Sequence, residues 1–166
     1  MGNEVFFHIS DTVFKKGDTL FPQEHGYTKS VNIRPFEQFI AKFMGNAKIA
    51  RDKCVFCCEE IDACYFSGGI EGAEYAVKPS GRYECSDLHW YTLASMAFYD
   101  NQPEMAEFYA KKYWSGERSG HGLECIEIRA EKLVVDHVVD MFDVDVKKKY
   151  KEPSRKEKHL ESEFSM

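Results

Sequence analysis

Two stretches near the end of the chain read LECIEIR, residues 123–129, and LVVDHVV, residues 133–139. Their composition predicts two strands that pair with each other. Three shorter strands are predicted at residues 4–10, 54–58 and 74–77, the last ended by Pro79-Ser80-Gly81. Short strands interspersed with scattered helices favour an α+β fold with a core of mostly antiparallel strands.

Four helices are predicted from capping and turn signals. The first begins at Pro35 and ends at Gly45-Asn46, and the second spans residues 59–66. The third is capped by Asp87 and runs to about Tyr99, and the fourth begins at Pro103 and runs to Trp114. Proline suits the first helical turn, and aspartate accepts hydrogen bonds from unpaired amides at a helix start. The last helix is expected to bury an apolar stripe formed by Met105, Phe108, Tyr109 and Tyr113.

Composition sets broad limits on function. The chain has 166 residues, 43% of them hydrophobic, which is enough for one globular domain. No apolar run approaches the roughly 18 residues that cross a bilayer, and the N-terminus lacks a signal-peptide pattern, so a cytoplasmic protein without membrane contact is expected. Residues 147–166 form a charged tail of net charge +3 that is expected to be flexible, whereas residues 1–146 carry −9. The acidic body argues against broad binding to a nucleic-acid backbone.

The six cysteines are expected to be reduced thiols. Cys54 and Cys57 have the spacing of half a zinc site, but no second pair follows at a suitable distance. In the sequence KCVFCC, residues 53–58, the thiols are interpreted as small hydrophobic side chains on a buried strand. No metal site is therefore expected.

Three motifs occur in a suggestive order. His8 lies in the first strand, FFHIS; the strand containing Phe56 leads into a helix that bears Tyr65; and Glu124 begins a late strand after a glycine-rich loop. In this order the motifs resemble the ADP-ribosyltransferase fold in its histidine–tyrosine–glutamate branch, over roughly residues 4–139. AKKYW, residues 110–114, is also similar to a helix that precedes the glutamate strand in small bacterial domains of this kind.

The resemblance implies a split, mostly antiparallel β-sheet core with peripheral helices, and a catalytic domain at residues 1–146. It implies NAD as substrate and transfer of one ADP-ribose to a macromolecular acceptor, either protein or nucleic acid. By the same resemblance, His8 would hold the adenosine ribose, and the adjoining Ile9 and Ser10 would also contact NAD. Tyr65 would stack on nicotinamide with Phe56 flanking the ring, and Glu124 would be the catalytic carboxylate. A role as a toxin or in phage–host conflict, with a neutralising antitoxin protein, is also implied.

Several alternatives stay open at this stage. His8 and Tyr65 can be structural residues, and Glu127 competes with Glu124, because residues three apart on a strand point to opposite faces. Cys57 and Cys58 stand where the family has a serine or threonine that helps to position the glutamate. A Cys–His hydrolase that pairs Cys125 or Cys85 with His89 or His137 lacks any local sign of an activated thiol.

The glycine-rich loop at residues 115–122 is predicted to be the most flexible segment of the chain. Beside an active site it could contact the acceptor through Arg118 and His121, and otherwise it is a plain surface loop. A second hypothesis for the whole chain is a non-catalytic binding protein on the same scaffold. It would use exposed aromatic residues for binding, namely Trp90, Tyr91, Tyr113 and Trp114.

Overall fold

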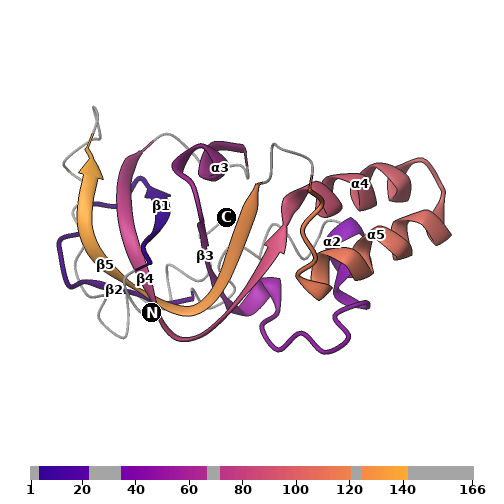
Figure 1. Cartoon of the computed structure of the whole chain (residues 1–166), viewed down its shortest axis with the longest axis horizontal. Helices are drawn as coiled ribbons and strands as arrows, with labels where there is room; N and C mark the ends of the chain where they lie inside the picture. The colour runs from indigo at the N-terminus through magenta and orange to yellow at the C-terminus, as the bar shows by residue number, and fades with distance from the viewer. Residues whose placement is uncertain (1–3, 23–34, 67–71, 121–124, 142–166) are drawn as a thin grey trace.

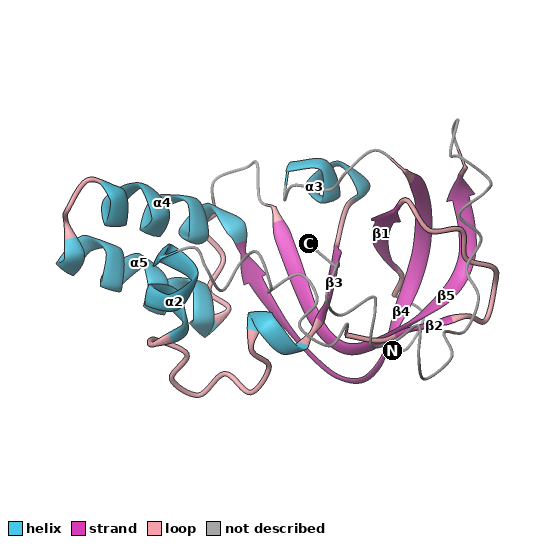
Figure 2. Cartoon of the chain, turned by 180° about the vertical axis from the view of Figure 1, so that it is seen from behind, coloured by secondary structure: helices cyan, strands magenta, loops and turns pink. Residues whose placement is uncertain are grey.

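The computed structural model describes residues 4–22, 35–66, 72–120 and 125–141. Its strands are β1 (Phe6–Ser10), β2 (Thr19–Leu20), β3 (Val55–Cys58), β4 (Ala73–Asp87) and β5 (Ile126–Asp140). Its helices are α2 (Pro35–Ala41), the 3-10 turn η1 (Arg51–Lys53), α3 (Ile61–Phe66), α4 (Leu88–Tyr99) and α5 (Pro103–Ser115). Figures 1 and 2 show the strands and α3 in one half of the molecule and α2, α4 and α5 in the other. The charged tail lies outside the described residues.

The five strands form one antiparallel sheet in the order β2-β5-β3-β1-β4. β4 also pairs with β5, so β5, β3, β1 and β4 close into a ring. The main hydrophobic core fills this ring with side chains such as Phe6, Tyr75, Ile128 and Leu133. The predicted α+β class with a mostly antiparallel core is therefore confirmed.

β5 corrects the prediction of two late strands paired with each other. Residues 126–140 form one continuous strand of 15 residues, and its partner along almost the whole length is β4. The polar residues Glu131 and Lys132, which separate the two apolar stretches, are exposed residues of this strand and not a turn. Because β4 pairs with both apolar stretches, it supplies the backbone hydrogen bonds that a hairpin between the two stretches would otherwise form.

β4 also runs much further than predicted. Pro79 and Gly81 were expected to end it, but the strand continues for 15 residues to Asp87. The register with β5 shifts between Ser80 and Tyr83, and Gly81 has a positive φ of 85° there. An irregularity of this kind lets a strand accommodate proline and glycine by bending.

A second core holds the helices together. It contains Phe36 and Ile40 of α2, Leu88 and Ala94 of α4, and Ala110, Tyr113 and Trp114 of α5. The cap at Asp87 is confirmed, since its carboxylate accepts a hydrogen bond from the backbone N–H of His89.

The predicted stripe of α5 is wrong in part. Met105 and Phe108 are exposed, whereas the buried face is formed by Ala106, Ala110 and Tyr113 together with Trp114. The small alanine side chains allow the paired helices to approach closely, and this packing turns the larger residues toward solvent. No helix in the described part of the chain has the length and hydropathy needed to cross a membrane.

Candidate functional site

His8 lies in the middle of β1, where its position is set by the neighbouring strands. Its partner across the β1–β4 pair is Tyr75, which is fully buried in the core of the ring. Directly opposed residues in an antiparallel pair share a face of the sheet, so His8 is on the inner face. Its side chain is half-buried.

One hydrogen bond determines which nitrogen of the neutral His8 ring carries the proton. Its Nδ1 lies 2.8 Å from the carbonyl oxygen of Phe56 in β3. A carbonyl only accepts hydrogen bonds, so Nδ1 carries the proton and Nε2 of the neutral ring is an acceptor. Burial lowers the pKa of His8, although the bond to Phe56 opposes this effect. The neutral imidazole can therefore accept a hydrogen bond from a hydroxyl group.

Helix α3, which carries Tyr65, packs against β1. Cys64 Sγ lies 3.1 Å from the carbonyl oxygen of Phe7, the residue before His8. Ala63 and Cys64 form a small core with Ile9 and Cys58, on the face of β1 opposite to the side chain of His8. The backbone of Tyr65 is thus placed beside β1, while its side chain lies outside the described part of the structure.

Glu124 and His121 also lie outside the described residues, but the chain beside Glu124 is placed. Cys125 Sγ contacts the carbonyl oxygen of Ala63 at 3.6 Å, and the N–H of Glu59 donates to the carbonyl of Ile126 at 3.2 Å. The start of β5 therefore adjoins α3. The sequence neighbours of the three proposed site residues therefore meet at α3. Cys64 belongs to this helix, and Phe7 and Cys125 contact it.

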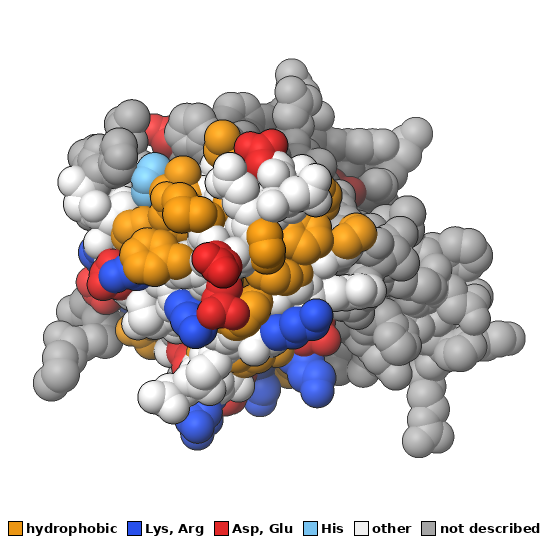
Figure 3. All heavy atoms as spheres, turned by 90° about the vertical axis from the view of Figure 1, so that its right-hand side faces the viewer, with side chains coloured by type: hydrophobic (Ala, Val, Ile, Leu, Met, Phe, Trp, Pro, Cys, Tyr) orange, Lys and Arg blue, Asp and Glu red, His pale blue; other side chains and the backbone are white. Residues whose placement is uncertain are grey.

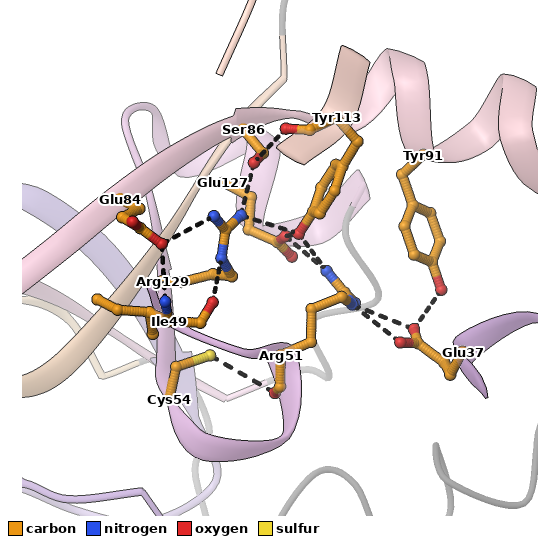
Figure 4. Close-up of polar contacts among 10 residues, drawn as sticks. All are labelled: Glu37, Ile49, Arg51, Cys54, Glu84, Ser86, Tyr91, Tyr113, Glu127 and Arg129. Atoms are coloured by element: carbon orange, nitrogen blue, oxygen red, sulfur yellow. Dashed lines mark hydrogen bonds and ion pairs between the residues drawn. The ribbon is translucent and has the colours of Figure 1, made fainter. Parts of the chain in front are cut away.

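Glu127, the alternative acid, is part of a buried polar network (Figure 4). Its carboxylate accepts hydrogen bonds from Arg51 Nη1 at 2.7 Å and from the Tyr113 hydroxyl at 2.6 Å, and its exposed fraction is 4%. Arg51 also forms an ion pair with Glu37 at 3.0 Å. Since Ile126 and Ile128 face the core of the ring, Glu127 faces away from the side that bears His8. This geometry gives Glu127 a structural role.

Phe56 belongs to the same outer face as Glu127. Val55 and Cys57 on either side of it pack inside the ring, and the guanidinium of Arg51 lies 5.0 Å from the centre of the Phe56 ring. The ring of Phe56 and the imidazole of His8 thus point to opposite faces of the sheet. What joins the two residues is the Phe56 carbonyl. The sequence contains no signal for this hydrogen bond, because the bond depends on which strands are neighbours in the sheet.

Ile9 and Ser10, the other residues of β1 assigned to NAD binding, have different environments. Ile9 is buried under α3. The hydroxyl of Ser10 accepts a hydrogen bond from the backbone N–H of Thr12 at 3.0 Å, at the end of β1. Ser10 lies on the same face as His8, so these are the two polar side chains that β1 presents on that face.

The part of the glycine-rich loop that the structure describes, residues 115–120, is held in place by side-chain contacts. Arg118 forms an ion pair with Glu59 at 2.6 Å, and Trp90 Nε1 donates to the carbonyl of Glu117 at 2.8 Å. Ser119 donates two hydrogen bonds to the buried carboxylate of Asp87. The expectation of a highly flexible segment is corrected for these residues.

The cysteines are free thiols. Burial raises the pKa of Cys125 to about 12 and also raises the pKa values of Cys85 and Cys57. A protonated thiol is a poor nucleophile, so these environments do not support a cysteine hydrolase. Among the described residues, no group of three or more His, Cys, Asp or Glu side chains has an arrangement that could hold a metal ion.

A hollow of about 810 Å³ in the described structure lies away from His8. It is open and is bordered by residues 42–47, the end of α5 and the second half of β4. Its polar residues include Lys42, Lys111 and Glu84, and the Glu84 carboxylate is already bonded to the backbone N–H groups of Lys48 and Ile49. Of the residues assigned to NAD whose side chains the structure describes, namely His8, Ile9, Ser10 and Phe56, none borders it.

No protein-family model matches the chain, and no curated protein is significantly similar to it in sequence.

Proposed function

We propose that the protein is a mono-ADP-ribosyltransferase that uses NAD as substrate, with His8, Tyr65 and Glu124 as its principal site residues and with an ADP-ribosyltransferase-like arrangement of its strands. The observation that supports the proposal is that the backbones of β1, α3 and the start of β5 adjoin one another through Phe7–Cys64 and Ala63–Cys125, although the His8 side chain points to the face of β1 opposite to α3. These contacts bring together chain segments that are more than 100 residues apart in sequence.

His8 suits a ribose-binding role because its Nε2 accepts hydrogen bonds. A ribose hydroxyl donates to it, and Ser10 on the same face of β1 adds a second polar group. NAD has two riboses joined by a pyrophosphate, so its two halves can be held by different elements. In this proposal β1 holds the adenosine half and α3 holds the nicotinamide half, while Phe56 contributes its carbonyl to orient His8.

The reaction breaks the bond between nicotinamide and its ribose. The bonding electron pair leaves with nicotinamide, which becomes neutral, and positive charge develops on the ribose. The carboxylate of Glu124 stabilises this cation and orients the acceptor. The acceptor nucleophile then bonds to the ribose carbon and gives up its proton to the Glu124 carboxylate. The acceptor is a macromolecule, protein or nucleic acid, and a neutralising partner protein would accompany a role in phage–host conflict.

Nicotinamide release from NAD tests the proposal. Glu124→Gln keeps the size of the side chain and removes its charge, so turnover should fall by about 100-fold or more. Glu104→Gln, an exposed change in the first turn of α5, is the matched control and should keep the wild-type rate. Equal rates for Glu124→Gln and the control would reject the assignment of Glu124.

A second candidate function is a non-catalytic binding protein, favoured by the helical end of the molecule. The aromatic residues first assigned to this role are not exposed: Tyr113 and Trp114 are buried, and Trp90 and Tyr91 are half-buried. Four other large apolar residues of α4 and α5 are exposed instead, namely Met96, Tyr99, Met105 and Phe108. Figure 3 shows hydrophobic side chains on this end, with charged ones between them.

Labelled NAD separates the two candidates. Incubation of the protein with NAD labelled in its adenylate part and a cell lysate should label a macromolecule if the protein is a transferase. Protease and nuclease treatment then identifies the acceptor. A binding protein would leave the lysate unlabelled, and in that case replacement of Phe108 by Ser should weaken binding of a captured partner while Glu124→Gln should not.

A further inference from the structure

Helix α5 packs one of its faces against the rest of the molecule and turns the other to solvent. Ala106, Ala110, Tyr113 and Trp114 are buried, whereas Phe108 is 53% exposed. Successive residues of a helix are rotated by about 100°, so Phe108 lies about 160° from Ala106 and from Ala110 and marks the centre of the opposite face. This position leaves a large apolar side chain in water, which favours a partner that covers it.

The outer face of α5, which consists of Glu104, Met105, Phe108, Lys111 and Lys112, has charges of opposite sign at its two ends. All of its residues are exposed except Lys112, which is half-buried. Glu104 lies about one turn before Phe108, and the two lysines lie about one turn after it. The outer face is therefore negative toward the start of α5, apolar near its middle and positive toward its end.

A face with this pattern is complementary to a second copy of itself that runs in the opposite direction. In a two-fold dimer the same patch of surface serves both subunits. Two copies of α5 that are antiparallel and meet at Phe108 bring the two Phe108 rings together and place each Glu104 beside Lys111 of the other copy. A parallel pair would instead place Glu104 beside Glu104 and Lys111 beside Lys111, and such like-charge contacts are unfavourable.

Lys111 can reach a second carboxylate. Its ammonium lies 3.2 Å from the Glu107 carboxylate of the same helix, and both side chains are exposed. An exposed pair of this kind contributes little to stability, and an ammonium has three protons to donate. Lys112 has a different role, because it pairs with Glu117 at 3.0 Å and its ammonium lies 5.4 Å from the centre of the Phe108 ring.

We propose that the outer face of α5 binds a second copy of this chain and forms an antiparallel, two-fold dimer centred on Phe108. Its charge complementarity selects both the occupant and the orientation. The face of one helix is smaller than the ~800 Å² that each partner buries in a standard complex, so the dissociation constant should be micromolar or weaker. α5 lies in the half of the molecule away from β1 and α3 (Figure 1), so the proposal is independent of the proposed function.

Sedimentation equilibrium of the full chain measures this association. The wild-type protein should change from monomer to dimer as its concentration rises from the micromolar to the millimolar range. Phe108→Asp places two carboxylates at the centre of the contact and should raise the dissociation constant by at least about tenfold. Because Phe108 is exposed, this variant should keep the circular dichroism spectrum of the wild-type protein. A wild-type protein that is still monomeric at millimolar concentration, or a Phe108→Asp variant that associates equally well, would overturn the proposal.

Reversal of single charges tests the orientation. Glu104→Lys faces Lys111 of the second copy in the antiparallel dimer and should raise the dissociation constant by about three- to tenfold. The double variant Glu104→Lys/Lys111→Glu exchanges the two charges and should recover most of this loss. Glu131→Lys, the same change at an exposed position of β5, is the matched control and should leave the dissociation constant unchanged.

A parallel pair would respond differently to these variants. Glu104→Lys would replace one like-charge contact by another and would leave the association unchanged. An unchanged dissociation constant in Glu104→Lys, or a double variant as weak as Glu104→Lys, would therefore overturn the antiparallel dimer.

Discussion

The imidazole of His8 combines two properties that rarely coincide on a strand residue. It is half-buried beside a hydrophobic core, yet its Nδ1 has a fixed partner in the Phe56 carbonyl at 2.8 Å. Burial disfavours the charged ring, and the bond selects one neutral tautomer. A single side chain is thereby prepared to accept a hydrogen bond at Nε2, whichever ligand donates it.

This environment predicts a pH dependence of stability. The pKa of His8 in the folded protein is lower than its value of about 6.5 in an unfolded chain, so the unfolded chain binds the proton more readily. The free energy of unfolding should therefore fall as the pH drops below about 6.5. In His8→Asn, whose side-chain nitrogen occupies the position of Nδ1 and can donate to the Phe56 carbonyl, urea titrations at several pH values should show a smaller fall. The wild-type protein and the variant share the other histidines, among them His89 and His137. Identical pH profiles of the two proteins would therefore contradict the assignment of this pH dependence to His8.

Gly72 is required by a close approach of two backbones. A Cβ placed there would lie 2.3 Å from the carbonyl oxygen of Ser10, at the end of β1. Backbone atoms cannot move aside as a flexible side chain can, so Gly72→Ala should lower the free energy of unfolding by about 1–3 kcal/mol. Gly120→Ala, where a Cβ meets open space at a φ of 69°, isolates the cost of a positive φ at about 1 kcal/mol. A smaller loss for Gly72→Ala than for this control would contradict the argument.

At the scale of elements, the long pair of β4 and β5 organises the sheet. Each strand has 15 residues, and β1 and β3 are attached to opposite halves of this pair before they meet each other. The pair must bend sharply for the ring to close. The bend falls where the register shifts between Ser80 and Tyr83.

Gly81 lies at this bend, and its substitution tests whether the bend requires the positive φ of a glycine. A side chain at Gly81 would be strained by the φ of 85° and would also meet Glu131 Oε2 at 2.7 Å. Because Glu131 is flexible, most of the cost should come from the backbone, about 1–2 kcal/mol for Gly81→Ala. The double variant Gly81→Ala/Glu131→Ala should recover little of this loss in thermal unfolding, whereas Gly81→Asn should lose less. Full recovery in the double variant would show that the contact with Glu131 is the cause.

At the scale of the whole molecule, two buried arginines connect the strands with the helices. Arg51 bonds to Glu37 of α2, to Tyr113 of α5 and to Glu127 of β5. Arg129 donates to the hydroxyl of Ser86 and to the carbonyl of Ile49. No buried side-chain nitrogen or oxygen in the described residues lacks a hydrogen-bond partner. The network therefore ties the orientation of the helical half to that of the sheet.

Removal of one charged residue from this network should lower the free energy of unfolding more than removal of all three charges of Arg51, Glu37 and Glu127. Arg51→Met leaves Glu37 and Glu127 buried without their cation, and the free energy of unfolding should fall by about 3–5 kcal/mol. The triple variant Arg51→Met/Glu37→Leu/Glu127→Leu should recover a large part of that loss. Lys111→Met breaks an exposed pair with Glu107 and should cost less than about 1 kcal/mol. Chemical denaturation measures all three, and a triple variant less stable than Arg51→Met would refute the explanation.

Local signals in the sequence were enough for most elements. Strand composition predicted β1 and β3, Asp87 predicted the start of α4, and Pro103 predicted the start of α5, because alternation, capping and a proline at the first turn act within a few residues. The position of His8 on a strand also followed from the sequence. The roles of Tyr65 and Glu124 remain predictions.

Only the tertiary structure decided how far the strands extend and which face each side chain occupies. Residues that end an isolated strand, such as Pro79 and Gly81, are tolerated within β4 because β5 supplies backbone hydrogen bonds on both sides of the bend. Glu127 was a candidate acid in the sequence, and it became a structural residue because folding placed Arg51 beside it. The contact between Arg51 and Glu127 joins residues 76 positions apart, and local sequence patterns do not predict a contact over such a separation.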